Sequence, residues 1–178
     1  MVRVCNLIKG KKMEKRDLYN EKRNLTGETI LKGDKIPEGK YIVVVLVFIQ
    51  NSEGNFLIQK RSERKNGKFA TTGGHPKSGE SSIEGILTEV KEEIGLELNP
   101  NELELYYSGK SEKERVFWDD YYIKIDIQDI KKLKLQEDEV SSVEWFSKNE
   151  IEILMKQGKF FKNHYEEFEI LLKWLNNK

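Results

Sequence analysis

Apolar residues gather in short segments whose spacing predicts strands. Residues 41–49, YIVVVLVFI, are nearly continuous and rich in β-branched side chains, which is typical of a strand buried on both faces. A turn over 51–55 contains Gly54, and residues 56–61 are expected to return as the second strand of a hairpin. The same reasoning predicts further strands at 69–72, 103–108, 116–127 and 143–146, and a short strand and turn within 18–31.

Three other segments follow the helical period. In the first, a core-facing stripe is predicted from the spacing of Ile83, Ile86, Leu87, Val90 and Ile94. Ser147, with Glu150 three residues later, predicts the N-cap of a second helix that runs to about residue 157 and stops at Gly158. The apolar residues within 163–176 predict an amphipathic C-terminal helix. Predicted strands both before and after the first helix in the sequence indicate an α/β protein with a mixed sheet between helices.

The composition limits the class of protein. The 178 residues suffice for one domain with a buried core. The 31 basic residues balance 31 acidic ones, so the net charge gives no general attraction to nucleic acid or to an anionic membrane, and neither is expected as a partner. The longest apolar run is far short of a membrane span of about 20 residues, and the start lacks the apolar region of a signal peptide. A cytoplasmic location is therefore expected.

The N-terminal region is expected to differ from the rest of the chain. Residues 1–23 contain eight basic and three acidic residues, which is typical of a solvated tail and, alternatively, of an arm that binds polyanions. We therefore expect a flexible arm over residues 1–16 and a single domain over 17–178. The single cysteine, Cys5, excludes an intrachain disulfide framework and fits a reducing compartment.

The first predicted helix carries three carboxylates that share one side. Glu89 lies three and four residues before Glu92 and Glu93, a spacing that brings side chains together on a helix. Like charges at this spacing destabilise a helix by a few tenths of a kcal/mol per pair, roughly, unless a cation compensates them. Hard oxygen ligands of this kind suit Mg²⁺ or Mn²⁺. The alternative is a solvated helix face, which is the common role of such charge runs.

The spacing around this helix resembles the Nudix box. Gly74 is followed after five residues by Glu80, and after seven more by the sequence TEVKEEIGL, residues 88–96. The family pattern is G-x5-E-x7-R-E-U-x-E-E-x-G-U, with U an aliphatic residue, and the single departure is Thr88 in place of the arginine. The resemblance covers roughly residues 17–158. It implies the Nudix fold, an α/β/α sandwich with a mixed β-sheet.

The resemblance also implies an activity. Nudix enzymes use Mg²⁺ to direct water at a diphosphate, and they cleave a nucleoside diphosphate linked to another group, NDP-X, into NMP and P-X, or cleave a related organic diphosphate. A small-molecule diphosphate is therefore the expected substrate. By the resemblance, Glu89, Glu92 and Glu93 form the metal site and the catalytic centre, and the backbone carbonyl of Gly73 joins the metal ligands. Which carboxylate acts as the general base is left open.

Supporting roles within the box follow from the same resemblance. Glu80 normally pairs with the arginine of the box. Because Thr88 cannot supply that ion pair, Lys77 or another base is expected to hold Glu80. Gly74 and Gly95 are expected to support the turn before the helix and the end of the helix.

Other candidates lie outside the box. A further acid often follows it in the family, and Asp119 is our preferred metal ligand among Asp119, Asp120, Glu112 and Glu114. Alternation along a strand puts Asp119 and Asp120 on opposite faces. The candidates for binding the substrate are Lys60, Arg61, Arg64 and His75. Alternatively, the three cations are solvated surface charges without a role in binding. The alternative for His75 is a purely structural role.

Two alternative functions remain. The motifs GGHP and SGES also resemble isopentenyl-diphosphate isomerase, but that enzyme needs a cysteine where Gly73 stands and additional histidines that this chain lacks. A non-catalytic nucleotide sensor on the same fold is favoured by Thr88 and opposed by the intact glutamates. The sequence leaves open which diphosphate is cleaved and whether the protein forms a homodimer.

Overall fold

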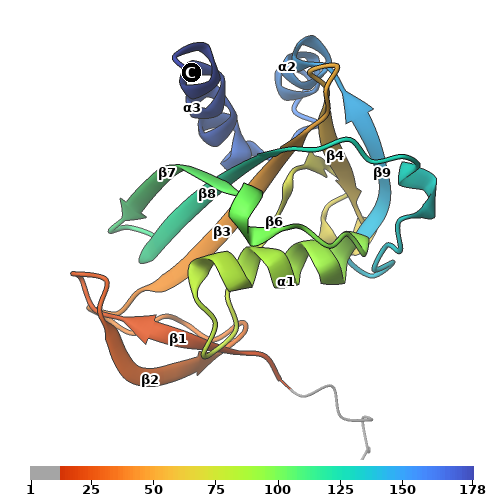
Figure 1. Ribbon diagram of the computed structural model, residues 1–178. Coiled ribbons are helices and arrows are strands. Elements are labelled where there is room, and N and C mark those ends of the chain that lie inside the picture. The colour runs from red at the N-terminus through yellow and green to blue at the C-terminus, as the bar shows by residue number, and fades with distance from the viewer. Residues whose placement is uncertain (1–12) are drawn as a thin grey trace, which may run out of the picture.

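The computed structural model describes residues 13–178, and residues 1–12, which include Cys5, lie outside the described part of the chain. The first strand begins at Lys15, within the segment 1–16 for which we predicted an arm. Figure 1 shows the elements, which follow one another as β1 (Lys15–Tyr19), β2 (Leu25–Leu31), β3 (Ile42–Gln50), β4 (Phe56–Arg61), η1 (Glu63–Lys65), β5 (Phe69–Ala70), β6 (Thr72–Gly74), α1 (Ser82–Ile94), η2 (Pro100–Glu102), β7 (Glu104–Ser111), β8 (Val116–Lys124), η3 (Ile130–Lys132), β9 (Val140–Phe146), α2 (Lys148–Lys156), η4 (Lys162–His164) and α3 (Tyr165–Asn176).

A mixed sheet forms the middle of the molecule. Strand β3 pairs in parallel with β8 along its whole length, from Ile42 opposite Val116 to Gln50 opposite Lys124, and β7 pairs antiparallel with β8. On its other side β3 pairs with β6, and it meets β4 only where Gln50 faces Phe56. The two strands of the predicted hairpin are therefore paired only next to their turn, because β6 occupies the edge of β3. Strand β4 pairs with β5 and β9 instead.

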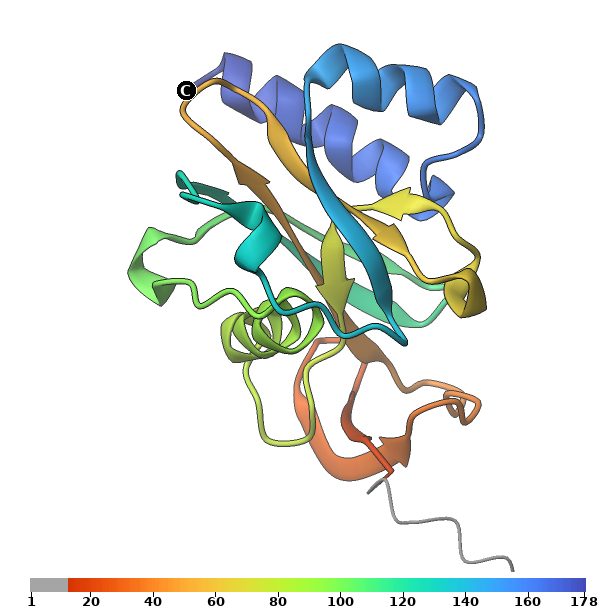
Figure 2. The ribbon, with the colours of Figure 1, turned by 90° about the vertical axis from the view of Figure 1, so that its right-hand side faces the viewer.

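Helices cover both faces of this sheet, as Figures 1 and 2 show. On one face, alternate residues of β3 such as Val45 and Val47 pack in a core with Ile86 and Val90 of α1. On the other face, Leu46 and Phe48 pack with residues of α2 and α3, among them Ile151, Phe168 and Leu171. The predicted α/β/α sandwich with a mixed sheet is confirmed. The near-continuous apolar run of β3 follows from its burial on both faces.

The helix ends follow local signals in the sequence. Ser81 caps α1 in a capping box with Glu84, and Gly95 closes the helix at φ +69°, a left-handed conformation that glycine adopts without strain. Ser147 and Glu150 form the predicted capping box of α2, and Gly158 follows that helix at φ +67°. The predicted C-terminal helix is also confirmed, with α3 preceded by a short 3₁₀ turn.

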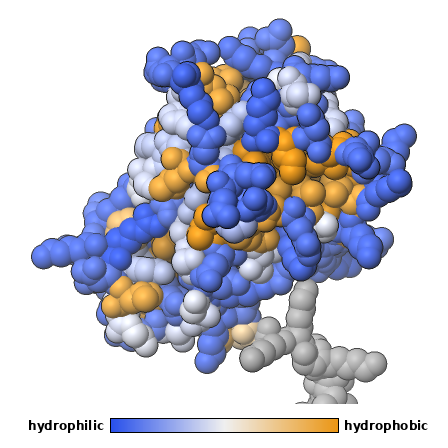
Figure 3. Space-filling model, viewed as in Figure 1, coloured by the Kyte–Doolittle hydropathy of each residue, from blue (hydrophilic) through white to orange (hydrophobic). Residues whose placement is uncertain are grey.

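The surface is mostly hydrophilic on the side that presents α1, with a hydrophobic patch beside that helix (Figure 3). Within residues 13–178, no helix is both long enough and apolar enough to cross a membrane. The β1–β2 hairpin forms a separate two-stranded sheet. Backbone hydrogen bonds join it to the rest of the domain, with bonds of 2.8 and 2.9 Å between Tyr19 and Tyr41 and one of 2.8 Å from the N–H of Ser78 to the carbonyl of Lys15.

Acid should weaken the fold through His164, which precedes α3. Burial and, to a lesser degree, Arg61 lower the pKa of His164 from 6.5 to about 3. Between those values the unfolded chain binds a proton that the folded chain does not, so stability falls as the pH drops below 6.5. We expect wild type to lose about 1–2 kcal/mol more than His164→Gln between pH 7 and pH 5 in urea unfolding. Equal losses would show that His164 does not titrate in this way.

Candidate active site

The end of β6 lies unusually close to both β3 and α1. A Cβ atom at Gly73 would stand 2.6 Å from the carbonyl oxygen of Val45, and one at Gly74 would overlap the carboxyl group of Glu89. Glu89 in turn accepts a hydrogen bond of 3.0 Å from the backbone N–H of His75. Both glycines are therefore required by close packing, and they hold the Glu89 carboxylate against the backbone of the strand end.

Glu93 is the most deeply buried carboxylate of the box, with 9% of its surface exposed. Its Oε2 accepts a hydrogen bond of 2.9 Å from Nε2 of Gln59 on β4, and the other end of that amide accepts one of 3.0 Å from Oγ1 of Thr72. Burial raises the pKa of Glu93 to about 7, and the charge of Glu89 adds to this rise. Burial raises the pKa of Glu89 as well. Two carboxylates thus lie near one another in a poorly solvated place.

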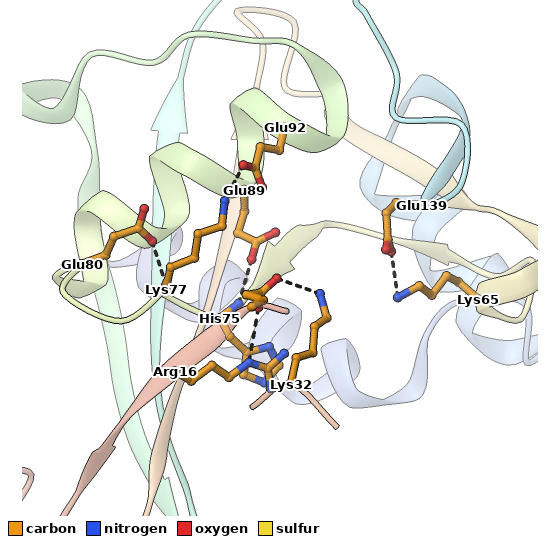
Figure 4. A network of polar contacts seen from close by, with 10 residues as sticks. Arg16, Lys32, Lys65, His75, Lys77, Glu80, Glu89, Glu92 and Glu139 are labelled. Carbon is orange, nitrogen blue, oxygen red and sulfur yellow. Dashed lines mark hydrogen bonds and ion pairs between the residues drawn. The ribbon is translucent and has the colours of Figure 1, made fainter. Parts of the chain in front are cut away.

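Glu92 points away from this pair. Its exposed carboxylate forms an ion pair with the ammonium group of Lys77, from the loop before α1 (Figure 4). Among residues 13–178, no three His, Cys, Asp or Glu side chains converge closely enough to hold a metal ion. The structure therefore brings together two of the three predicted ligands, Glu89 and Glu93, and Lys77 neutralises the third.

Glu89 and Glu93 nevertheless suit a divalent cation. Two buried carboxylates with raised pKa values repel one another, and a hard cation would neutralise both while taking oxygen ligands of the kind it prefers. The absence of a side chain at Gly74 leaves room for the Glu89 carboxylate beside the strand end. Glu92 could join Glu89 and Glu93 as a metal ligand only after its ion pair with Lys77 is broken.

Glu80 is held by two hydrogen bonds. Its Oε2 accepts from the backbone N–H of Lys77 at 2.8 Å, and its Oε1 accepts from Oγ1 of Thr88 at 2.9 Å. We expected Lys77 to replace the missing arginine, and Lys77 does hold Glu80, but through its backbone, since its side chain turns to Glu92. Thr88 cannot form an ion pair, yet its hydroxyl still ties Glu80 to the helix.

The end of β4 and the segment after it form a basic loop, which carries the predicted substrate-binding cations Lys60, Arg61 and Arg64, and these contribute unequally. Arg61 donates a hydrogen bond of 3.1 Å to the carbonyl of Lys65 and lies 4.8 Å from the ring centre of Phe161. Its charge favours the ionised form of Glu93, so it lies on the side of the box. The ammonium group of Lys60 lies 3.9 Å from Glu63, and Arg64 is exposed in η1.

Lys65 is a further cation of this loop, and it pairs with Glu139 at 2.9 Å, as Figure 4 shows. Glu139 is also among the charges that raise the pKa of Glu93. The loop before β9 is fixed to the end of α1, because the N–H of Gln136 donates to the carbonyl of Glu93 at 2.9 Å. These contacts form one wall of the site.

The N-terminal hairpin supplies a second wall, which sequence reasoning missed. Glu14 lies 3.5 Å from Nε of Arg16 and 3.1 Å from Nζ of Lys32. Figure 4 shows Arg16 and Lys32 on the same side of Glu89 as His75. Burial, with the charge of Arg16, lowers the pKa of His75 to about 3, so its imidazole is neutral near pH 7. These contacts join residues far apart in the chain, and no local pattern signals them.

Asp119 is engaged elsewhere in the structure. Arg23 donates two hydrogen bonds to its carboxylate, one of 2.9 Å, and Ser108 donates a third of 2.6 Å. Burial alone would raise the pKa of Asp119, but the bonds from Arg23 and Ser108 outweigh it and lower the pKa. The predicted opposite orientation of Asp120 agrees with its proximity to Glu167 of α3. Glu112 accepts hydrogen bonds from Tyr41 and Lys110.

Comparison with known proteins places the chain in a family. The family model of the NUDIX domain matches residues 40–168. An uncharacterised Nudix hydrolase of Listeria monocytogenes is 35% identical over 153 residues, which cover 83% of this chain and 88% of the relative. The chain belongs to the Nudix hydrolase family.

Solved structures share the fold. A crystal structure from Deinococcus radiodurans matches with a TM-score of 0.69 at 24% identity and covers 87% of this chain and 96% of that one. A bifunctional NMN adenylyltransferase/ADP ribose pyrophosphatase from Francisella tularensis, complexed with AMP and a Mn ion, matches with a TM-score of 0.57 at 19% identity. That alignment covers 80% of this chain and 43% of the other. The predicted Nudix fold is confirmed.

The Thr88 hydroxyl should have a measurable effect on stability. Thr88→Val keeps the shape of the side chain but removes the donor to Glu80, so we expect the free energy of unfolding to fall by about 1 kcal/mol in urea titrations. Thr88→Ser keeps the donor and serves as the control. An unchanged free energy of unfolding in Thr88→Val would show that this hydrogen bond does not stabilise the fold.

Proposed function

We propose that this protein is a hydrolase that adds water to a diphosphate and cleaves NDP-X into NMP and P-X. The observation that carries the proposal is the pair of buried carboxylates, Glu89 and Glu93, fixed against a glycine strand end. The Francisella relative in fold is described as an ADP ribose pyrophosphatase, which supports a nucleoside diphosphate derivative as the class of substrate. Cation-bearing segments on either side of the pair suit an anionic substrate.

A divalent cation, Mg²⁺ or Mn²⁺, belongs to this proposal. Glu89, Glu92 and Glu93 would hold it, with the carbonyl of Gly73, and when bound it supplies charge neutralisation for the phosphates and a lower pKa for a bound water. Gln59 fixes the orientation of Glu93 through a hydrogen bond. Lys77 keeps the exposed Glu92 carboxylate paired with a cation.

The chain's own groups account for the remaining steps. A carboxylate of the buried pair takes a proton from the attacking water, the new P–O bond forms, and the bridging P–O bond breaks with its electrons on the leaving phosphate. Arg61, Arg16 and Lys32 are the proposed partners of the phosphate oxygens, because their charges act on Glu93, His75 and Glu89 respectively. Their present partners are carboxylates or backbone carbonyls, which phosphate can replace.

The structure favours hydrolysis over isomerisation. An isomerase of the related branch needs a cysteine at the position of Gly73. Any Cβ atom there would approach the carbonyl oxygen of Val45 to 2.6 Å, so β6 would have to move. The proposal is tested by incubating the protein with Mg²⁺ and a panel of NDP-X compounds in ¹⁸O-labelled water. Release of NMP and P-X with one ¹⁸O in a phosphate product supports hydrolysis, and migration of the double bond in isopentenyl diphosphate supports the isomerase.

Glu93→Gln should lower kcat by about 10² or more, because it removes a charge at the centre of the reaction while keeping the hydrogen bond to Gln59 within reach. The measurement is steady-state hydrolysis of the best compound from the panel. Glu97→Gln is the matched control, since Glu97 is an exposed glutamate that pairs with Lys91 outside the site. Turnover near that of wild type in Glu93→Gln would remove Glu93 from the mechanism.

Lys32→Met should raise KM for ADP-ribose by about tenfold, because it removes one cation from the substrate side of Glu89. Lys35→Met, in the exposed loop after the hairpin, is the control and should behave as wild type. An unchanged KM in Lys32→Met would mean that Lys32 serves only to pair with Glu14.

A further inference from the structure

Two buried polar side chains lie where β6 separates β4 from β3. Gln59 of β4 has 3% of its surface exposed, and Thr72 of β6 has 4%. Side chains alternate along β4, and Leu57, two residues before Gln59, belongs to the core that packs against α1. The alternation therefore predicts an apolar side chain at position 59 as well. The protein has an amide there instead, and this amide faces the carboxylate of Glu93.

Thr72, Gln59 and Glu93 form a continuous hydrogen-bond network. Oγ1 of Thr72 donates to Oε1 of Gln59 at 3.0 Å, and Nε2 of Gln59 donates to Oε2 of Glu93 at 2.9 Å. An ionised carboxylate only accepts hydrogen bonds, so the N–H end of the amide has to face Glu93. The oxygen of the amide then faces Thr72, whose hydroxyl has to donate. Every bond of the network therefore points toward Glu93.

The network engages only one of the two oxygens of Glu93. Within residues 13–178, Oε1 of Glu93 has no hydrogen-bond partner, and it is not among the fully buried unpartnered oxygens, so it is open to solvent. The charge of Glu89 acts on Glu93, which puts the two carboxylates near one another. Gln59 thus holds Oε2 and leaves Oε1 available to a cation.

Packing alone does not explain the polar pair of Thr72 and Gln59. A buried amide and a buried hydroxyl lose their hydrogen bonds to water, and the bonds that they form in the protein roughly offset this loss. Apolar groups of the same shape at both positions would therefore leave the stability nearly unchanged. Metal binding does explain the pair, because the hydrogen-bond partners of a metal ligand typically change metal affinity by about 10- to 100-fold.

We propose that Thr72 is a positioning residue for the cation site and that it acts through Gln59. Its hydroxyl fixes the amide, and the amide holds the Glu93 carboxylate so that Oε1 is free to bind the cation. This inference rests on the proposed function, because it concerns the divalent cation of that hydrolase. A carboxylate that is already held in place loses little freedom when the cation binds, which makes the complex tighter.

Binding of Mn²⁺, measured by the loss of the electron paramagnetic resonance signal of the free ion, tests this role without any turnover. Thr72→Val keeps the shape of the side chain and removes the donor to Gln59, so we expect the Kd for Mn²⁺ to rise about fivefold, the effect of one lost hydrogen bond. Thr72→Ser keeps the hydroxyl and should bind Mn²⁺ as wild type does. A wild-type protein that does not bind Mn²⁺, or an unchanged Kd in Thr72→Val, would overturn the inference.

Thr71→Val is the matched control. Thr71 is also buried and its hydroxyl also donates a hydrogen bond, but the acceptor is the backbone carbonyl of Val47 rather than Gln59. We expect Thr71→Val to lose about as much stability in urea unfolding as Thr72→Val, and to keep the wild-type Kd for Mn²⁺. An equal rise in Kd in both variants would show that Thr72 has only a structural role.

A double-mutant cycle tests whether Thr72 acts through Gln59. Gln59→Leu removes the donor to Glu93 and should raise the Kd for Mn²⁺ about tenfold. Thr72→Val should then change the Kd no further in the Gln59→Leu background, because the amide that Thr72 holds is gone. Additive effects of the two substitutions would contradict the proposed path. If Gln59→Leu does not fold, Gln59→Met, whose side chain is unbranched, takes its place in the cycle.

Hydrolysis and the role of Thr72 are tested independently by these measurements. If the protein hydrolyses none of the compounds but its Mn²⁺ affinity depends on Thr72, the positioning role stands and the hydrolase function fails. If the protein hydrolyses NDP-X and Thr72→Val binds Mn²⁺ as wild type does, the hydrolase function stands and the positioning role fails.

Discussion

The close approach of the β6 end to its neighbours is the constraint on which the site depends. Because Gly73 and Gly74 have no side chains, β6 lies against β3 and the Glu89 carboxylate reaches the backbone of the strand. The same insertion of β6 separates β4 from β3 beyond their turn, so that β4 pairs with β9. Gln59 then faces Glu93, and the basic loop that follows β4 comes to the same side as the box. The absence of side chains at Gly73 and Gly74 thus helps to position the carboxylates, their hydrogen-bond donor and the nearby cations.

The sheet separates two kinds of polar chemistry. On the α1 face, the buried carboxylates Glu89 and Glu93 have hydrogen-bond donors, and Arg61 and Lys32 lie nearby. On the α3 face, the buried side-chain atoms of residues 13–178 that lack a hydrogen-bond partner are mostly acceptors, and no cation is paired with Asp120. The alternation of side chains along β8 produces this division, since it turns the adjacent residues Asp119 and Asp120 to opposite faces.

The features that were predicted correctly, chiefly the helices and their ends, depend on signals that act over a few residues of the sequence. The period of residues 83–94, the capping boxes at Ser81 and Ser147 and the glycine at 95 act over a few residues, and they fixed the helices correctly. The direction of each glutamate depended on contacts made across the fold. Glu93 turns inward to an amide 34 residues away, and Glu92 turns outward to a lysine of the preceding loop. The hairpin wall with Arg16 and Lys32 has no local signal either, because its place depends on how β1 and β2 join the domain.

The Arg23–Asp119 pair explains how that hairpin is held in place. Arg23 has a φ of +62° in the turn between β1 and β2, and its guanidinium group reaches the buried carboxylate of Asp119 on β8. A buried carboxylate needs such a partner, and a bidentate arginine provides one with a fixed geometry. Ser78 and the N–H of Gly79, in the loop before α1, bond to Asp17 of β1 and add a second attachment. The hairpin is therefore tied to β8 and to the loop that carries Lys77, and both ties orient Arg16 and Lys32 toward Glu89. In this geometry Asp119 acts as an anchor for one wall of the site, and its charge is already balanced by Arg23.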